Sequence, residues 1–211
     1  MKAVILEMNP QTPQPTKLRR AVEALQAGGI VAIPTDTVYA LATRLQNKAG
    51  IERIRKYRKM SEEKYMTFLI ESLTPIAEYA HVSNAAFKLI RQLIPGSYTF
   101  ILPATKAVPK QAMHPRRHTV GIRIPDEPVT LALLRELGEP LLSISAFAQD
   151  VVFDSFEDLI RELQAVADVI LKVPNFSLGE PSTVLDLTAE PFTIVREGAG
   201  MEELEGFLLE S

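Results

Sequence analysis

Hydrophobic periodicity divides the chain into alternating helical and extended segments. A helix is expected over 17–27, where Leu18, Ala21, Val22 and Leu25 recur at intervals of three and four residues. The helix ends at a Gly-Gly pair, and the four apolar residues 30–33 that follow predict a buried strand. The same criteria predict helices over 48–59, 74–79, 83–93, 128–137, 155–166 and 202–209, and strands over 3–6, 68–70, 97–102, 119–124, 141–144, 169–173, 183–187 and 192–195. Thr16 is expected to cap the first helix and Ser83 or Asn84 the helix 83–93, whose buried stripe is expected to include Phe87.

Helices and strands alternate through most of the chain, which favours an α/β fold with a central sheet. The strands are closely spaced around 97–124 and 183–195, which indicates a mixed rather than a purely parallel sheet. The sequence contains no internal repeat, no low-complexity segment and no visible domain boundary. We therefore predict a single domain over residues 1–211.

Three short polar residues follow the strand predicted at 30–33. Pro34 ends that strand because it has no amide hydrogen to donate. Thr35, Asp36 and Thr37 then precede an apolar run, 38–41, that is expected to open a helix. A helix N-terminus offers free amide groups and is capped by such side chains, so this tip could cap a helix, bind a ligand, or do both.

Composition and charge restrict the function. With 211 residues, of which 46% are hydrophobic, the chain can bury a sizeable core. Its net charge of -3 gives no overall attraction to nucleic acid, so an anionic ligand must meet a local group of Lys and Arg. The most basic segment, 103–118, suits either a solvated loop or an RNA backbone. There is no cysteine and no apolar run long enough for a membrane span, and we expect a cytoplasmic protein.

Common catalytic signatures are absent. The sequence has no GxGxxG, no GxxxxGK, no GxSxG and no HExxH. His114 and His118 are four residues apart, but Pro115 between them disfavours a helix that would bring both to one metal ion. No metal site is predicted.

Short polar clusters stand instead at the ends of predicted strands, where loops converge on a ligand crevice in sheet-based folds. Arg123 is the hardest of them to explain structurally, because it is flanked by apolar residues and a half-buried guanidinium usually meets an anion. The clusters are PTDT at 34–37, KYR at 56–58 with Lys64, Thr119 to Arg123, Ser143 with Ser145, Pro181-Ser182-Thr183, and Arg196.

Several segments together resemble the YrdC/YciO family. They are PTDTVYAL at 34–41, KYR at 56–58, PGSYTFIL at 95–102, TVGIRIP at 119–125, SISA at 143–146, PSTVLDLT at 181–188 and VREG at 195–198, in the same order as in the family. The resemblance implies a YrdC-like domain: a twisted, open, mixed sheet flanked by helices, with a concave, positively lined surface. Active members join L-threonine, bicarbonate and ATP into threonylcarbamoyl-AMP and pyrophosphate, for the threonylcarbamoyladenosine modification of tRNA.

The resemblance also implies roles for individual residues. Thr35, Arg123 and Ser182 would hold threonine or its carbamate, with Arg123 gripping a carboxylate by two hydrogen bonds. Asp36 is then expected to be a loop or capping residue. Mg²⁺ would arrive with ATP rather than bind a protein cage, and no protein nucleophile is expected. The residues that would bind ATP are Lys56, Arg58, Lys64, Thr119, Ser145 and Arg196.

The chain departs from the synthases at two places, and PGSYTFIL together with the missing asparagine resembles the YciO branch of the family. Ala40 follows Tyr39 where the synthases usually carry glycine, and Phe147 stands where they carry the asparagine of a Ser-Ala-Asn segment. A phenyl ring can neither donate nor accept the hydrogen bonds of that amide. Lys56 and Arg58, however, keep the cationic spacing of the synthases. Two hypotheses therefore stay open: a threonylcarbamoyl-AMP synthase, and a YciO-like nucleotide- or RNA-binding protein with weak or no synthase activity.

Overall fold

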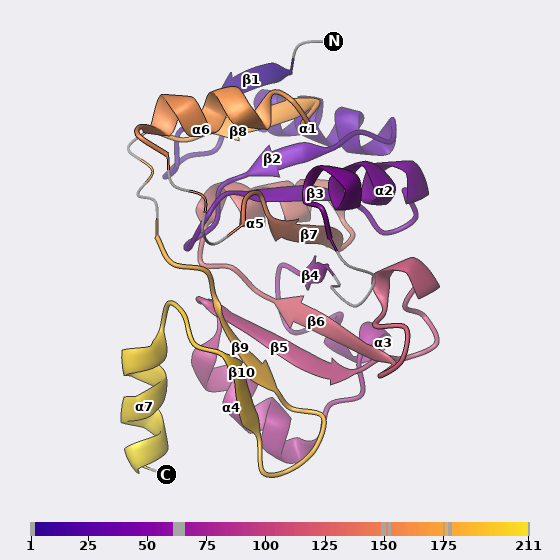
Figure 1. The fold of residues 1–211 in the computed structure, drawn as a ribbon, viewed down its shortest axis with the longest axis vertical. Coiled ribbons are helices and arrows are strands. Elements are labelled where there is room, and N and C mark those ends of the chain that lie inside the picture. Colours follow the sequence, from indigo (N-terminus) through magenta and orange to yellow (C-terminus); the bar gives the residue numbers. More distant parts are fainter. Residues whose placement is uncertain are drawn as a thin grey trace.

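A single twisted sheet of ten strands runs through the part of the chain that the structure describes. The computed structural model describes residues 3–60, 66–148, 151, 153–174, 176 and 179–210. The strand order is β1-β8-β2-β3-β7-β4-β6-β5-β9-β10, from top to bottom in Figure 1. The strands are β1 Val4–Glu7, β2 Val31–Ile33, β3 Ala40–Arg44, β4 Thr67–Leu69, β5 Tyr98–Pro103, β6 Thr119–Arg123, β7 Leu141–Ser145, β8 Val169–Lys172, β9 Thr183–Asp186 and β10 Thr193–Arg196.

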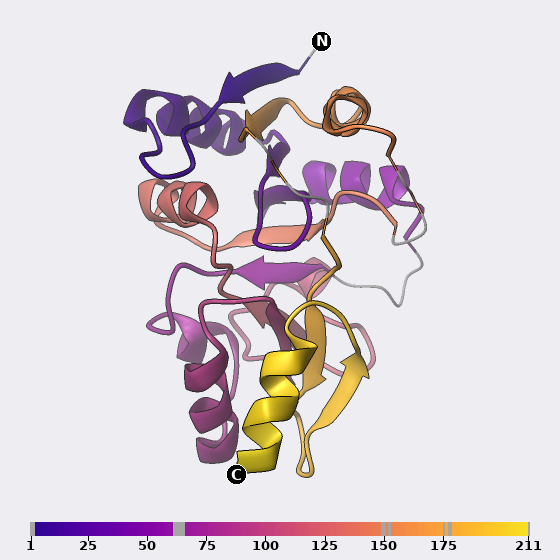
Figure 2. The ribbon, with the colours of Figure 1, turned by 90° about the vertical axis from the view of Figure 1, so that its left-hand side faces the viewer.

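The sheet is mixed, as the strand spacing predicted. The pairs β1–β8, β8–β2, β4–β6 and β5–β9 are parallel, and the other neighbours are antiparallel. In Figure 2, α1, α5 and α4 lie on one side of the sheet, and α2 and α6 lie on the other side of its upper half. The helices are α1 Pro15–Gln26, α2 Lys48–Tyr57, α3 Ile76–Tyr79, α4 Asn84–Leu93, α5 Pro128–Leu137, α6 Phe156–Leu163 and α7 Met201–Glu210, with a 3-10 turn at Lys110–Ala112.

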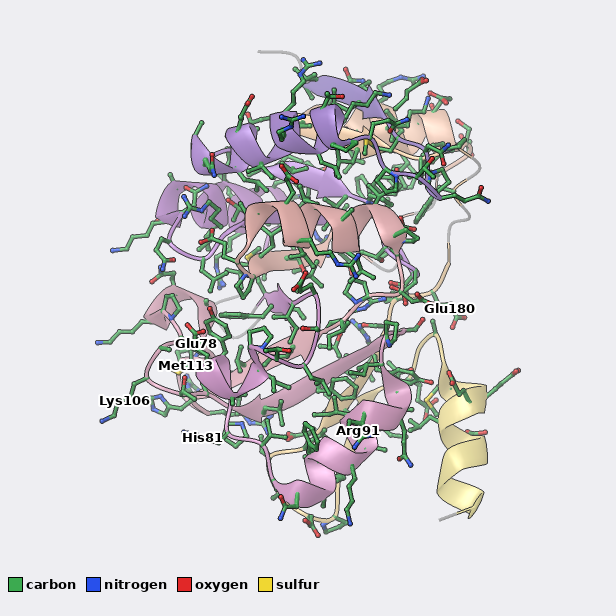
Figure 3. The ribbon with its side chains drawn as sticks, turned by 180° about the vertical axis from the view of Figure 1, so that it is seen from behind. Glu78, His81, Arg91, Lys106, Met113 and Glu180 are labelled. Carbon is green, nitrogen blue, oxygen red and sulfur yellow. The ribbon has the colours of Figure 1, made fainter. Side chains whose placement is uncertain are left out.

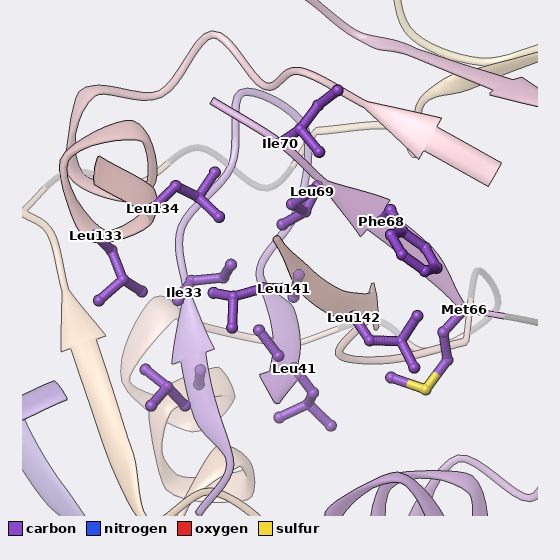
Figure 4. Close-up of a cluster of buried hydrophobic side chains, with 14 of the residues drawn as sticks. Ile33, Leu41, Met66, Phe68, Leu69, Ile70, Leu133, Leu134, Leu141 and Leu142 are labelled. Carbon is purple, nitrogen blue, oxygen red and sulfur yellow. The ribbon is translucent and has the colours of Figure 1, made fainter. Parts of the chain in front are cut away.

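The core lies where α5 packs on the middle strands of the sheet. Leu133 and Leu134 of α5 point toward Ile33 of β2 and Leu141 of β7 (Figure 4), and these side chains are almost completely buried. Helices cover both faces here, so the strands carry continuous apolar runs instead of alternating ones. Gly138 ends α5 at a positive φ of 74°, which confirms the helix end predicted there.

The prediction that residues 38–41 open a helix is wrong. After a loop the chain returns as β3, antiparallel to β2, with Val31 opposite Ala42. A short apolar run fits a buried strand as well as a helix, and burial between β2 and β7 decides for the strand. The Thr-Asp-Thr tip is therefore a strand-to-strand loop, and it has no helix amide groups to offer.

Two details of the helix predictions also differ. α1 begins at Pro15 without a side-chain cap, so Thr16 does not cap it; proline suits the first turn because its missing N–H would be unpaired there. Phe87, expected on the buried stripe of α4, is 40% exposed, and Ala86 is buried in its place. The capping role of Ser83 is confirmed, because its hydroxyl accepts a hydrogen bond from the Ala86 amide.

Candidate functional site

A cavity of about 470 Å³ opens beside the β2–β3 loop and the ends of β6, β7 and β9. We call it the arginine cavity. Arg58, Arg123 and Arg196 line it, and hydroxyl groups and apolar side chains form the rest of its wall. No acidic residue is among the described residues that line it. Six of the nine site residues predicted from the sequence line it: Thr35, Arg58, Arg123, Ser145, Ser182 and Arg196.

Arg123 is held by a buried carboxylate. Its Nη2 donates to Asp36 Oδ1 at 2.7 Å, and its Nη1 donates to the Thr37 hydroxyl at 3.0 Å. The side chains of Arg123 and Asp36 are only 8% and 12% exposed. Ser97 donates a further hydrogen bond to Asp36 Oδ2 at 3.0 Å. The expectation that Asp36 is only a loop or capping residue is wrong: the fold brings it to β6 as the counter-ion of Arg123.

One donor of Arg123 is left over. Its Nε is buried and has no hydrogen-bond partner among the described residues. Burial lowers the pKa of Arg123 from its ordinary value, and the neighbouring Asp36 opposes that change. A buried N–H without an acceptor costs about 1–3 kcal/mol.

The Thr35 side chain organises its own loop. Its hydroxyl donates to the Val38 carbonyl at 2.6 Å and accepts from the amides of Thr37 and Val38, each at 3.2 Å. Thr130 of α5 holds the start of the loop by donating to the Pro34 carbonyl at 2.6 Å. The loop is thus preformed, and the Thr35 side chain lines the cavity from a fixed position.

Arg196 is held in another way. Its Nε and Nη2 donate to the Ser182 carbonyl at 3.0 and 2.6 Å, and Nη2 also lies 3.1 Å from the Ser182 hydroxyl. That hydroxyl forms a further hydrogen bond with Thr99 Oγ1 at 2.9 Å. Burial lowers the pKa of Arg196. No ion pair between Arg196 and a carboxylate is present in the described part of the chain, so its positive charge is available to a ligand.

Arg58 and Phe147 also line the cavity. Arg58 Nε donates to the Ser145 carbonyl at 2.8 Å, which joins the end of α2 to the end of β7. The Phe147 ring packs edge-on against Phe153, with ring centroids 4.4 Å apart, and its centroid lies 6.5 Å from that of Tyr57. An aromatic cluster therefore occupies the place where the synthases are expected to carry an amide.

Two predicted site residues that the structure describes, Lys56 and Thr119, do not line this cavity. Lys56 is exposed on α2. Thr119 is buried at the start of β6, and its hydroxyl finds no partner among the described residues. Lys64 lies outside the described residues.

The basic loop is only partly a charged surface. Lys106 extends away from the body of the protein beside α3 (Figure 3). Arg117, by contrast, forms an ion pair with Asp186 of β9. One of its cations is therefore engaged within the fold, which weakens the case for an RNA backbone at this loop.

Sequence reasoning missed the residues that hold Arg123. Asp36, Thr37 and Ser97 come from the β2–β3 loop and the residue before β5, far from Arg123 in the sequence. The available signal was the isolated Arg in an apolar strand, which called for an anion. The position of that anion in the chain could not be read from spacing.

Comparison with known proteins gives a consistent result. A family model named Sua5_yciO_yrdC and described as "Telomere recombination" matches residues 23–198. An uncharacterised protein of Haemophilus influenzae is 40% identical over 92% of this chain and 94% of its own length. The uncharacterised protein YciO of Escherichia coli is 37% identical over 92% of this chain and 94% of its own.

The crystal structure of E. coli YciO aligns with a TM-score of 0.85 over 93% of this chain and 96% of that one, at 35% identity. The threonylcarbamoyl-AMP synthase of Mus musculus is 32% identical over 90% of this chain and 70% of its own. The match to the synthase is thus weaker than the match to YciO. In the described part of the chain, no helix is long and apolar enough to cross a membrane.

Proposed function

We propose, because the chain belongs to the Sua5, YciO and YrdC family, that the protein is a YciO-type member that binds an adenine nucleotide in the arginine cavity. Its threonylcarbamoyl-AMP synthase activity is weak or absent in this proposal. The relatives support that choice, since the uncharacterised YciO proteins are more similar to the chain than the synthases are.

The observation that carries the proposal is the charge of the cavity wall. Arg58, Arg123 and Arg196 line one cavity whose described lining residues include no acid. Asp36 behind the wall neutralises Arg123, so Arg58 and Arg196 supply the net positive charge. Guanidinium groups bind phosphate by charge-assisted hydrogen bonds, which are roughly twice as strong as neutral ones. Mg²⁺ would come as a companion of the phosphates, because no described residue of the cavity wall offers a carboxylate to hold it separately.

Phe147 supports the weak or absent synthase activity. It lines the cavity and packs in an aromatic cluster with Phe153 and Tyr57, so a polar contact to the reacting groups is lost there. A missing polar contact of that kind costs about 1–3 kcal/mol. By transition-state arithmetic this lowers a rate by roughly tenfold to a hundredfold.

Full synthase activity is the second candidate, favoured by Thr35, Arg123 and Ser182 lying around the same cavity. Threonine and bicarbonate would give a carbamate, whose oxygen attacks the α-phosphorus of ATP as pyrophosphate leaves. The protein would then act by positioning the reactants and by supplying positive charge.

Calorimetry and an activity assay test the proposal together. ATP should bind in a 1:1 complex, and uncharged adenosine should bind at least about 30-fold more weakly, because it lacks the phosphates. Equal affinity for ATP and adenosine would refute an anion site. Incubation with ATP, L-threonine and labelled bicarbonate should give little labelled adenylate.

A substitution at Phe147 separates the two candidates. Phe147→Asn should raise the rate of adenylate formation about tenfold by restoring the amide. Phe87→Asn, at an exposed ring on α4, is the matched control and should change nothing. Rapid turnover by the unmodified protein would establish the second candidate instead.

A further inference from the structure

A second, smaller cavity adjoins the arginine cavity. It has a volume of about 220 Å³, and we call it the side pocket. We propose that the side pocket receives the apolar side chain of a small carboxylate bound beside the nucleotide, so that the protein takes a branched-chain or aromatic amino acid rather than threonine. This inference rests on the proposed function, because it assigns the second ligand of the same site.

The two cavities share a wall. Val38, Ser145, Phe147 and Pro181 line both of them. Val38 carries the carbonyl that accepts the Thr35 hydroxyl, and Pro181 precedes Ser182. A ligand placed against Thr35 and Ser182 can therefore extend a side chain past the Phe147 ring into the side pocket.

The side pocket is apolar where a side chain would enter. Phe147, Phe153 and Leu159 line it, and their side chains are hydrocarbon. Tyr39 contributes its ring, because its hydroxyl donates to the Leu171 carbonyl at 3.0 Å and accepts from the Val173 amide at 3.2 Å. Val151, also on the wall, is 46% exposed and would be covered by an apolar ligand group.

The wall on the loop side has little freedom to move. A Cβ placed on Gly179 would lie 2.9 Å from the Thr37 carbonyl oxygen, so these two loops are in close backbone contact. Thr37 is itself bonded to Arg123. The side pocket and the Arg123 end of the arginine cavity therefore share one rigid support.

The chemistry of the two cavities defines the ligand class. Arg196 lines the arginine cavity with a guanidinium held by uncharged partners, and such a group binds an anion such as a carboxylate. The neighbouring apolar pocket favours a hydrocarbon group, and one additional methylene there discriminates by roughly 10-fold or more. A threonine hydroxyl placed in it would lose its hydrogen bonds to water without replacement.

Competitive binding tests this assignment. The full chain is saturated with a non-hydrolysable ATP analogue, and the binding of L-threonine, L-valine, L-isoleucine and L-phenylalanine is measured by calorimetry. L-isoleucine or L-phenylalanine should bind at least about 10-fold more tightly than L-threonine.

A substitution that fills the side pocket provides a second test. Ala148 lines the side pocket and not the arginine cavity, so Ala148→Leu should weaken the preferred amino acid at least fivefold and leave L-threonine unchanged within about twofold. Ala107→Leu, on an exposed loop position, is the matched control.

Several results would overturn the inference. L-threonine binding as tightly as the apolar amino acids would do so, and so would equal effects of Ala148→Leu on all of them. If Ala148→Leu instead weakens the binding of ATP more than the binding of inorganic tripolyphosphate, the adenine base occupies the side pocket and the inference fails. Loss of nucleotide binding in the unmodified protein would refute the proposed function itself, which keeps the two failures distinct.

Discussion

The two arginines at the ends of strands β6 and β10 line the same cavity but are held by different partners. Arg123 donates to the buried carboxylate of Asp36 and to Thr37. Arg196 donates to the carbonyl and the hydroxyl of Ser182, which are uncharged. Burial lowers the pKa of Arg123, Asp36 opposes that change, and the charge of Arg196 adds a smaller lowering; burial alone lowers the pKa of Arg196.

The different partners of the two arginines give them different roles in the cavity. The formal charges of Arg123 and Asp36 cancel, so this end of the cavity carries little net charge. Arg196 keeps its full charge, since its partners are dipoles. We therefore expect loss of Arg123 to affect stability most and loss of Arg196 to affect anion binding most.

The largest expected effect is on folding, from Arg123→Met. This change leaves the Asp36 carboxylate buried with Ser97 as its remaining side-chain donor, and should lower the free energy of unfolding by about 3 kcal/mol. Urea denaturation measures it. The double variant Arg123→Met with Asp36→Asn removes both charges and should recover at least half of the loss. A single variant as stable as the unmodified protein would show that the ion pair does not hold the loop.

The next effect is on binding, from Arg196→Gln. Loss of a charge-assisted contact of about 2 kcal/mol should weaken ATP binding about 30-fold. Loss of the hydrogen bonds to Ser182 should lower the free energy of unfolding by only about 1 kcal/mol. Calorimetry and denaturation give the two numbers. Arg91→Gln, on exposed α4 (Figure 3), is the matched control. If both variants bind ATP equally well, Arg196 is not the anion-binding end.

The smallest effect concerns Glu127, the acid beside Asp36. Its side chain accepts from the Val129 amide at the start of α5, and burial raises its pKa, with that hydrogen bond opposing the shift. Because the pKa of Glu127 is higher in the folded state, its protonated form favours folding. That contribution to stability is fully present below the unfolded pKa and is lost as pH rises through the folded pKa.

Glu127→Gln should therefore flatten the decline of stability with pH. The group is only partly buried and solvent screens its charge, so the difference should stay below about 0.5 kcal/mol. Melting temperatures of both proteins between about pH 4 and pH 7 measure it. A steeper pH dependence in the variant would contradict the sign of the shift.

Most of the secondary structure could be predicted because its signals are local. The apolar spacing of α1, the Pro128 start and Gly138 end of α5, and the β-branched strand β6 depend on neighbouring residues. The run 38–41 failed because four apolar residues satisfy a helix and a buried strand equally well. Only its pairing with β2 and β7 distinguishes the two.

The candidate site was predicted residue by residue but not as an arrangement. The motifs pointed to Thr35, Arg123, Ser182 and Arg196, and the fold brings these four to one cavity. The partner of Arg123 could not be predicted, because Asp36 and Arg123 are separated by 87 residues and meet only through the sheet.

By itself the sequence determined the α/β class, the mixed sheet and the polar segments at the strand ends, since hydrophobic period and backbone preference act over a few residues. The tertiary structure alone decided that Asp36 neutralises Arg123, that Arg196 keeps its charge and that an apolar side pocket adjoins both. These features depend on which loops meet across the sheet. Strand order and packing decide which loops meet, whereas spacing along the chain does not.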